Sequence, residues 1–183
     1  MKRILGSLAL ATMMITAASA QMVIDNTQTP QQLVQDVLLG QGVVVSNITY
    51  TGNPAQIGYF NATNAIFPIQ EGIVMSSGDV TDVPAAGNAF ASTGFAGAGD
   101  PDLNVVSSAG TNDAVVLEFD FVPTGDSIKF DYIFGSEEYT EFVNAGFNDV
   151  FAFIISGPGF NGPFAHGGEN IALIPGTSTP VTI

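Results

Sequence analysis

The stretch LEFDFVPTGDSIKFDYIF, from Leu117 to Phe134, decides the fold class of this protein. Two runs in which apolar and charged residues alternate flank the turn-forming sequence Pro-Thr-Gly-Asp. This period of two is typical of β-strands that bury one face and expose the other. We therefore predict a hairpin with a buried aromatic face and a charged face toward solvent.

Shorter apolar runs bounded by glycine, proline, asparagine and serine lie on both sides of this hairpin. They are GVVVSNITYTG, IGYFN and GIVMSSG upstream, and VFAFIIS, IALIP and VTI downstream. Many short strands separated by turn residues predict a mainly-β domain, either a β-sandwich or a jelly-roll-like fold. Residues 82–110 are rich in glycine and alanine, and we predict one or two long loops there.

One short amphipathic helix is expected near the N-terminus. Thr29 is suited to cap it, Pro30 to occupy its first position, and Gly40 to follow its end. The apolar positions between them form one face: Leu33, Val34, Val37 and Leu38. We expect this face to pack on the core.

The first twenty residues have the features of a secretory signal peptide. A basic start at Lys2 and Arg3 precedes an apolar stretch, and Ala18-Ser19-Ala20 provides a cleavage sequence. The apolar stretch is too short to span a membrane comfortably. We predict an exported protein, extracellular or on the cell surface, with no membrane insertion after cleavage.

The expected organisation follows from this division. Residues 1–20 form the signal peptide, residues 21–28 an N-terminal extension and residues 29–183 a β domain. The final VTI run ends the sequence on an apolar strand. We therefore expect a domain that is truncated at its C-terminus and continues in a longer protein.

The charge of the predicted mature chain is strongly negative. Cleavage after Ala20 removes two of the three bases. The remaining chain has seventeen acidic residues and one basic residue, Lys129, which gives a net charge of −16. Nucleic acid is excluded as a partner because phosphate binding needs a basic surface. Cysteine is absent, which excludes disulfides, thiol catalysis and cysteine-based metal sites.

The acids cluster in a way that suits calcium, which takes six to eight oxygen ligands. Asp100, Asp102 and Asn104 have the spacing of the first three ligands of a calcium loop, although Val105 and Thr111 break the rest of the EF-hand pattern. Further oxygens are expected from Asp113, Glu137, Glu138, Asn148 and Asp149. The alternative is that these residues form Asx turns and solvated strand ends.

Catalysis has weaker support in the sequence. A catalytic triad would depend on His166, the one histidine, and no G-x-S-x-G sequence is present. A glycan-acting enzyme could use Glu137 or Glu138 with a distant acid. Adjacent residues of a strand face opposite sides, however, so these two glutamates do not form a catalytic pair by themselves.

Several segments resemble the choice-of-anchor L domain of bacterial surface and secreted proteins. They are TPQQLVQDVLLGQGVVVSNITYTG, GDPDLN, LEFDFVPTGDSIKFDYIFGSEEY, FNDVFAFIISGPG and NIALIPGTSTPVTI, in that order along the chain. The resemblance covers Thr29 to Ile183. It implies an extracellular β-rich module coupled to a sorting or anchoring signal, with no established catalytic activity and no assigned ligand.

Together these features predict a non-catalytic, calcium-stabilised binding or adhesion module. The expected partner is an extracellular glycan or a surface protein. The alternatives are the glycan-acting enzyme and a structural spacer within a larger envelope protein. No C-terminal anchor is recognisable in this sequence, so the mode of surface attachment stays open.

Overall fold

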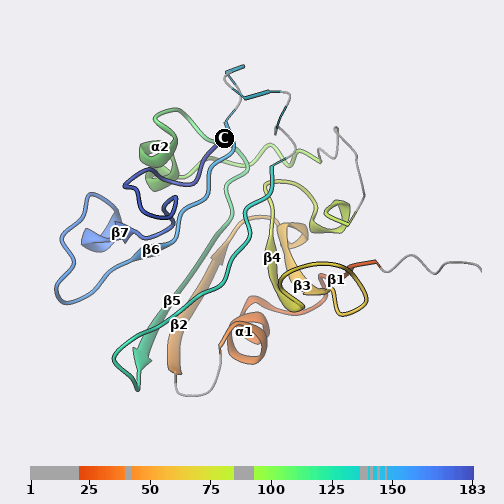
Figure 1. The fold of residues 1–183 in the computed structure, drawn as a ribbon, viewed down its shortest axis with the longest axis horizontal. Helices are drawn as coiled ribbons and strands as arrows, with labels where there is room; N and C mark the ends of the chain where they lie inside the picture. The colour runs from red at the N-terminus through yellow and green to blue at the C-terminus, as the bar shows by residue number, and fades with distance from the viewer. Residues whose placement is uncertain are drawn as a thin grey trace, which may run out of the picture.

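The computed structural model describes residues 21–39, 43–84, 93–136, 140, 142–143, 145–146 and 148–183. Over these residues the chain forms seven β-strands in three antiparallel sheets, together with a few short helices (Figure 1). The mainly-β class predicted from the sequence is confirmed. The predicted signal peptide, residues 1–20, lies outside the described residues.

The first sheet has three strands in the order β1-β3-β4. They are β1 (Val23–Asp25), β3 (Ile57–Asn61) and β4 (Glu71–Met75). Two of them correspond to the predicted runs IGYFN and GIVMSSG. Strand β1 lies within residues 21–28, which were predicted as an extension outside the domain, and it pairs along β3.

The second sheet joins β2 (Val43–Thr51) to β5 (Val116–Pro123). The two strands run side by side as the longest pair in Figure 1. A bulge interrupts the register at Asn47, whose φ is 52° and whose Nδ2 donates a hydrogen bond of 2.6 Å to Asp120 Oδ2. Phe119 is half-buried and Glu118 exposed, so the predicted alternation of β5 is confirmed.

The predicted partner of β5 is wrong. Residues 127–134 were expected to complete a hairpin with β5, but they form no strand, and β5 pairs with β2 instead. The reason is long-range: the aromatic side chains of residues 130–134 contact another segment of the chain. Ring centroids lie 4.6 Å apart for Phe130 and Phe153, and 5.2 Å apart for Tyr132 and Phe151.

The aromatic face itself exists, because Phe134 also stacks on Phe151, with centroids 6.4 Å apart. It is less buried than predicted, since Tyr132 exposes 41% of its surface. The contacts pair residues 130 and 132 with residues 153 and 151, so the two segments run in opposite directions. Alternation thus predicted which side chains share a face, but not what that face contacts.

The third sheet is small and joins β6 (Ile154–Ile155) to β7 (Glu169–Asn170). The backbone N–H of Phe153 donates to Asn170 Oδ1 at 3.0 Å, which continues the connection beyond the ladder. The strand predicted at residues 150–156 is shortened to β6. The strands predicted at residues 171–175 and 181–183 are reduced to isolated bridges, between Leu173 and Pro180 and between Val150 and Thr182.

The first helical segment begins as α1 (Pro30–Gln32) and continues as a π-helical segment η1 (Leu33–Leu38). Thr29 caps it: its Oγ1 accepts from Gln32 N at 3.2 Å, and Gln32 Oε1 accepts from Thr29 N at 2.8 Å. Leu33 and Val34 are fully buried. The segment lies beside β2 and β4 and closes one side of the core.

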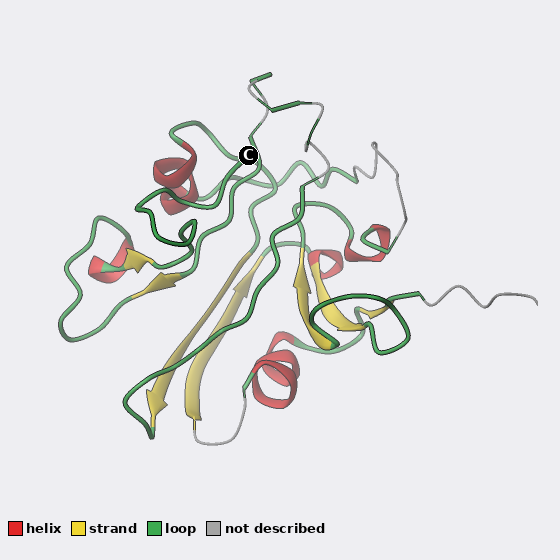
Figure 2. Ribbon diagram, viewed as in Figure 1, coloured by secondary structure: helices red, strands yellow, loops and turns green. Residues whose placement is uncertain are grey.

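A second helix, α2 (Pro101–Ser107), lies within residues 82–110, which were predicted to be loop. That prediction is wrong over these seven residues. The remaining helical turns are the 3-10 segments η2 (Pro54–Gln56), η3 (Val80–Asp82) and η4 (Ala165–Gly167). Figure 2 shows how much of the described chain is loop.

Candidate functional site

Asp100 stands immediately before α2 and caps it. Its Oδ1 accepts hydrogen bonds from Asp102 N at 2.9 Å and from Leu103 N at 3.0 Å. Aspartate followed by proline is a favourable start for a helix, because the carboxylate satisfies free N–H groups while Pro101 has none to satisfy. The oxygen spacing that suggested a calcium loop is here the start of a helix.

The other two polar residues of this motif hold neighbouring loops. Asp102 accepts a hydrogen bond from Ala165 N at 3.0 Å, which ties α2 to the η4 turn. Asn104 Oδ1 accepts from Thr111 N at 2.6 Å and from Thr111 Oγ1 at 2.8 Å, which closes the loop after α2. Each predicted ligand of this motif thus has a structural role.

Asp113 organises the loop that precedes α2. It adopts a left-handed conformation, with φ of 49°. Its carboxylate accepts from Phe95 N at 3.2 Å and also from Gly97 N. A Cβ on Gly97 would lie 3.0 Å from Asp113 Oδ1, so glycine permits this close approach.

Gln56 connects the same region to the first sheet, and sequence reasoning missed it. It is only 2% exposed. Its Nε2 donates to Ser77 O at 2.8 Å and to Asp113 O at 2.9 Å, while its Oε1 accepts from Asn53 N at 2.6 Å. The sequence Asn53-Pro-Ala-Gln56 is a helix-capping signal that indicates the last of these bonds, but not the two long-range ones.

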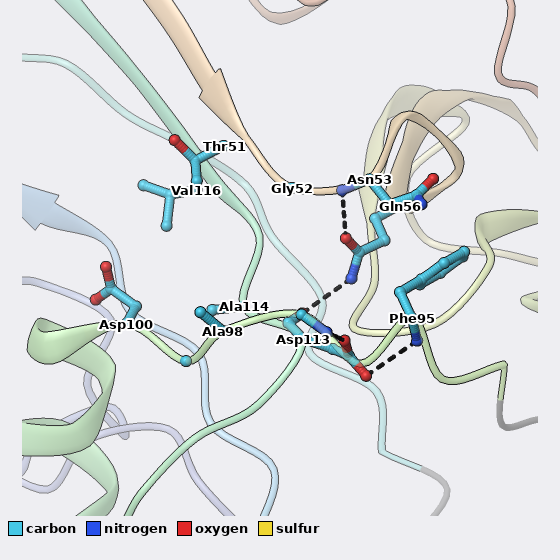
Figure 3. Close-up of a pocket in the computed structure, with 12 residues that line it drawn as sticks. Thr51, Gly52, Asn53, Gln56, Phe95, Ala98, Asp100, Asp113, Ala114 and Val116 are labelled. Atoms are coloured by element: carbon cyan, nitrogen blue, oxygen red, sulfur yellow. Dashed lines mark hydrogen bonds between the residues drawn. The ribbon is translucent and has the colours of Figure 1, made fainter.

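An open cleft of about 360 Å³ lies between the end of β2 and the segments on either side of α2. It is lined by Thr51, Gly52, Asn53, Gln56, Phe95, Gly97, Ala98, Gly99, Asp100, Asp113, Ala114 and Val116. Figure 3 shows the carboxylates of Asp100 and Asp113 apart and pointing away from each other, with that of Asp113 turned toward Phe95 N. They do not converge on one point as the ligands of a single metal ion would.

Tyr50 lies next to the cleft-lining residue Thr51 in the chain, and its hydroxyl donates to Asn53 O at 2.7 Å. Burial raises the pKa of Tyr50 to about 12. The hydroxyl therefore stays protonated at physiological pH and keeps this hydrogen bond to the loop at the end of β2.

A second acidic region lies at the end of the aromatic segment. Ser136 Oγ donates to Asp149 Oδ2 at 2.5 Å, across thirteen residues of sequence. The side-chain amide nitrogen of Asn148 donates hydrogen bonds to two backbone carbonyl oxygens, that of Asp149 at 3.1 Å and that of Ile183 at 2.6 Å. Glu137 and Glu138 follow Ser136 directly, but their positions lie outside the described residues.

The described part of the chain contains no group of three or more acidic or histidine side chains arranged to hold a metal ion. Asp100, Asp102 and Asp113 are thus close in the fold without forming a common coordination sphere. Asp149 lies beside the chain that leads to Glu137.

Over the described residues, the fold defines a β-rich module. The family model of the choice-of-anchor L domain matches residues 21–183, and the chain belongs to this family. Domains of this family are typically found in exported or surface proteins. No curated protein and no solved structure matches the chain. Among the described residues, no helix is both long and apolar enough to cross a membrane.

Proposed function

We propose that this chain is an exported, non-catalytic binding module of sandwich-like architecture, and that it is stabilised by calcium. Its partner would be an extracellular glycan or a surface protein. The calcium site would centre on Asp149 with Glu137 and Glu138, and Asn148 is the next candidate ligand. Asp100, Asp102, Asn104 and Asp113 would contribute less, because N–H groups already donate hydrogen bonds to at least one oxygen of each side chain.

One observation carries the calcium proposal: the hydrogen bond of 2.5 Å between Ser136 Oγ and Asp149 Oδ2. It brings the segment that leads into Glu137-Glu138 against the Asn148-Asp149 pair. Several carboxylates supplied from two segments are what calcium requires. With seventeen acids and one base after residue 20, a divalent cation would also relieve like-charge repulsion.

Thermal unfolding of residues 21–183 with calcium and with chelator tests this proposal. A ligand at about 100 times its Kd adds about 2.7 kcal/mol to the free energy of unfolding. We expect a higher melting temperature in calcium, and a much smaller calcium effect in Asp149→Asn. The matched control is Asp36→Asn, which removes an exposed carboxylate from η1 and should keep the full effect.

Two results would count against calcium. One is an equal melting temperature in calcium and in chelator for the wild-type protein. The other is a calcium effect that Asp149→Asn and Asp36→Asn reduce equally, which would indicate general charge screening. Glu137→Gln and Glu138→Gln then determine which glutamate takes part.

A further inference from the structure

We propose that Asn61 is a site of N-linked glycosylation, modified on the folded first sheet by a transferase that uses a diphosphate-activated sugar. The pattern Asn-x-Ser/Thr, called the sequon, marks such sites in exported proteins. The chain contains it twice, at Asn47-Ile48-Thr49 and at Asn61-Ala62-Thr63. The two sequons differ in local structure, and this difference favours Asn61. The inference goes beyond the binding role proposed above and does not depend on calcium.

The side-chain amide oxygen of Asn61 is held by its own sequon. Asn61 Oδ1 accepts hydrogen bonds from Thr63 N at 3.0 Å and from Thr63 Oγ1 at 2.7 Å. When an amide nitrogen loses a proton, negative charge develops on the amide oxygen. Two donors already in place stabilise that charge, as the donors of an oxyanion hole do. The Thr63 hydroxyl therefore helps the nitrogen of Asn61 to act as a nucleophile.

The amide nitrogen of Asn61 lies beside a path for that proton. Asn61 Nδ2 donates to Tyr59 Oη at 3.3 Å, and Tyr59 Oη donates to Glu71 Oε2 at 2.8 Å. The bond to Glu71 raises the pKa of the Tyr59 hydroxyl, which therefore stays protonated at physiological pH and keeps donating to the carboxylate. Glu71 is thus one hydroxyl away from the nitrogen and is placed to act as a general base.

The site lies where an enzyme can reach it. Asn61 is the half-buried last residue of β3, and its cross-strand neighbours are Val23 and Glu71. Val23 exposes 62% of its surface, and Glu71 and Thr63 are exposed as well. The preceding residue, Phe60, is buried, and successive side chains of a strand point to opposite faces. A sugar on Asn61 would therefore extend away from the core.

The sequon at Asn47 is arranged differently. Asn47 lies in the bulge of β2, and its Nδ2 donates to Asp120 Oδ2 at 2.6 Å, which holds the amide against β5. Thr49 Oγ1 donates across the ladder to Glu118 Oε2 at 3.5 Å. The sequon hydroxyl thus serves Glu118, whereas at Asn61 it serves the amide oxygen. Asn47 is therefore an internal control that has the sequence pattern without this geometry.

The reaction balances with an activated sugar as the one co-substrate. The Nδ2 of Asn61 gives one proton to the base, and its electron pair forms a bond to the anomeric carbon of the sugar. The bond from that carbon to the diphosphate oxygen breaks, and the diphosphate leaves with the electron pair. The diphosphate is carried by a nucleotide for transfer inside the cell, or by a lipid for transfer after export. Both carriers present the same chemistry to Asn61.

Peptide mass spectrometry of the full chain, purified from the organism that makes it, tests the inference. We expect a sugar on Asn61 in the wild type and in the control Asn47→Gln, and none at position 61 in Asn61→Gln. Thr63→Ala should lower the modified fraction about tenfold or more, and Thr63→Ser should restore it because the hydroxyl returns. Tyr59→Phe should lower the fraction as well. Circular dichroism verifies that each variant is folded.

Removal of residues 1–20, the predicted signal peptide, keeps the chain inside the cell and identifies the sugar donor. Modification of this form indicates a nucleotide-linked sugar, and modification of the exported form alone indicates a lipid-linked one. An unmodified Asn61 in both forms would overturn the inference. Equal modification of Asn47 and Asn61 would also overturn it, as would a modified fraction that Thr63→Ala and Tyr59→Phe leave unchanged. In either case the geometry around Asn61 would have no part in the reaction.

Discussion

The side chain of Gln56 joins three parts of the fold, and its removal gives a sharp test of how the fold is held together. Gln56→Met keeps the length of the side chain and removes its hydrogen bonds. Ser77 O and Asp113 O then lose a donor, and Asn53 N loses an acceptor. A buried polar group left without a partner costs about 1–3 kcal/mol.

The three groups are partly buried, so we use the lower end of that range for each. The expected loss is about 3 kcal/mol, a large share of the 5–15 kcal/mol that stabilises a typical domain. Urea unfolding followed by circular dichroism measures it. If the free energy of unfolding falls by about 2 kcal/mol per molar urea, the urea concentration at the midpoint of unfolding should fall by about 1.5 M.

The matched control is Gln70→Met. Gln70 is exposed, and its Nε2 donates a local hydrogen bond of 2.6 Å to Phe67 O. Its substitution should change the free energy of unfolding by about 0.5 kcal/mol or less. Equal small losses in the two variants would refute the view that Gln56 holds β3, the end of β4 and the Asp113 loop together.

Two further predictions concern acids whose roles the structure defines. Asp100→Ala should lower the free energy of unfolding by about 1 kcal/mol, because α2 loses its cap, whereas Asp100→Asn should cost only a few tenths; urea titration distinguishes them, and equal losses would contradict the capping role. The hydroxyl and N–H of Thr81 lower the pKa of Asp79 below its ordinary value of 3.8. Its contribution is therefore present above that value and is lost as the pH falls, so wild type should lose more stability than Asp79→Asn between about pH 5 and pH 2. Parallel pH profiles of the two proteins would contradict this assignment.

Local sequence signals predicted several elements well. The alternation in VLEFDFV predicted β5, and the sequence IGYFN predicted β3 with its bounds. These signals work because a strand that buries one face needs an apolar residue at every second position. The cap at Thr29 was equally readable, since a side-chain oxygen and a following proline act within one turn.

The same local reasoning failed where one pattern serves two structures. The sequence Asp-Pro-Asp-Leu-Asn is typical of a turn and also of the start of a helix, and a helix formed where a loop was predicted. Residues 127–134 alternate like a strand, yet no strand forms there. Their aromatic face contacts Phe151 and Phe153, and no local rule could have named that contact.

Composition and short motifs were thus enough to predict the mainly-β class, the acidic character and the membership of the choice-of-anchor L domain family. Three contacts became visible only in the folded chain: the pairing of β2 with β5, the hydrogen bond from Gln56 to Asp113 O and the hydrogen bond from Ser136 to Asp149. The physical reason is distance along the chain: these contacts join groups many residues apart. Many alternative partners satisfy the same local pattern, and packing selects one.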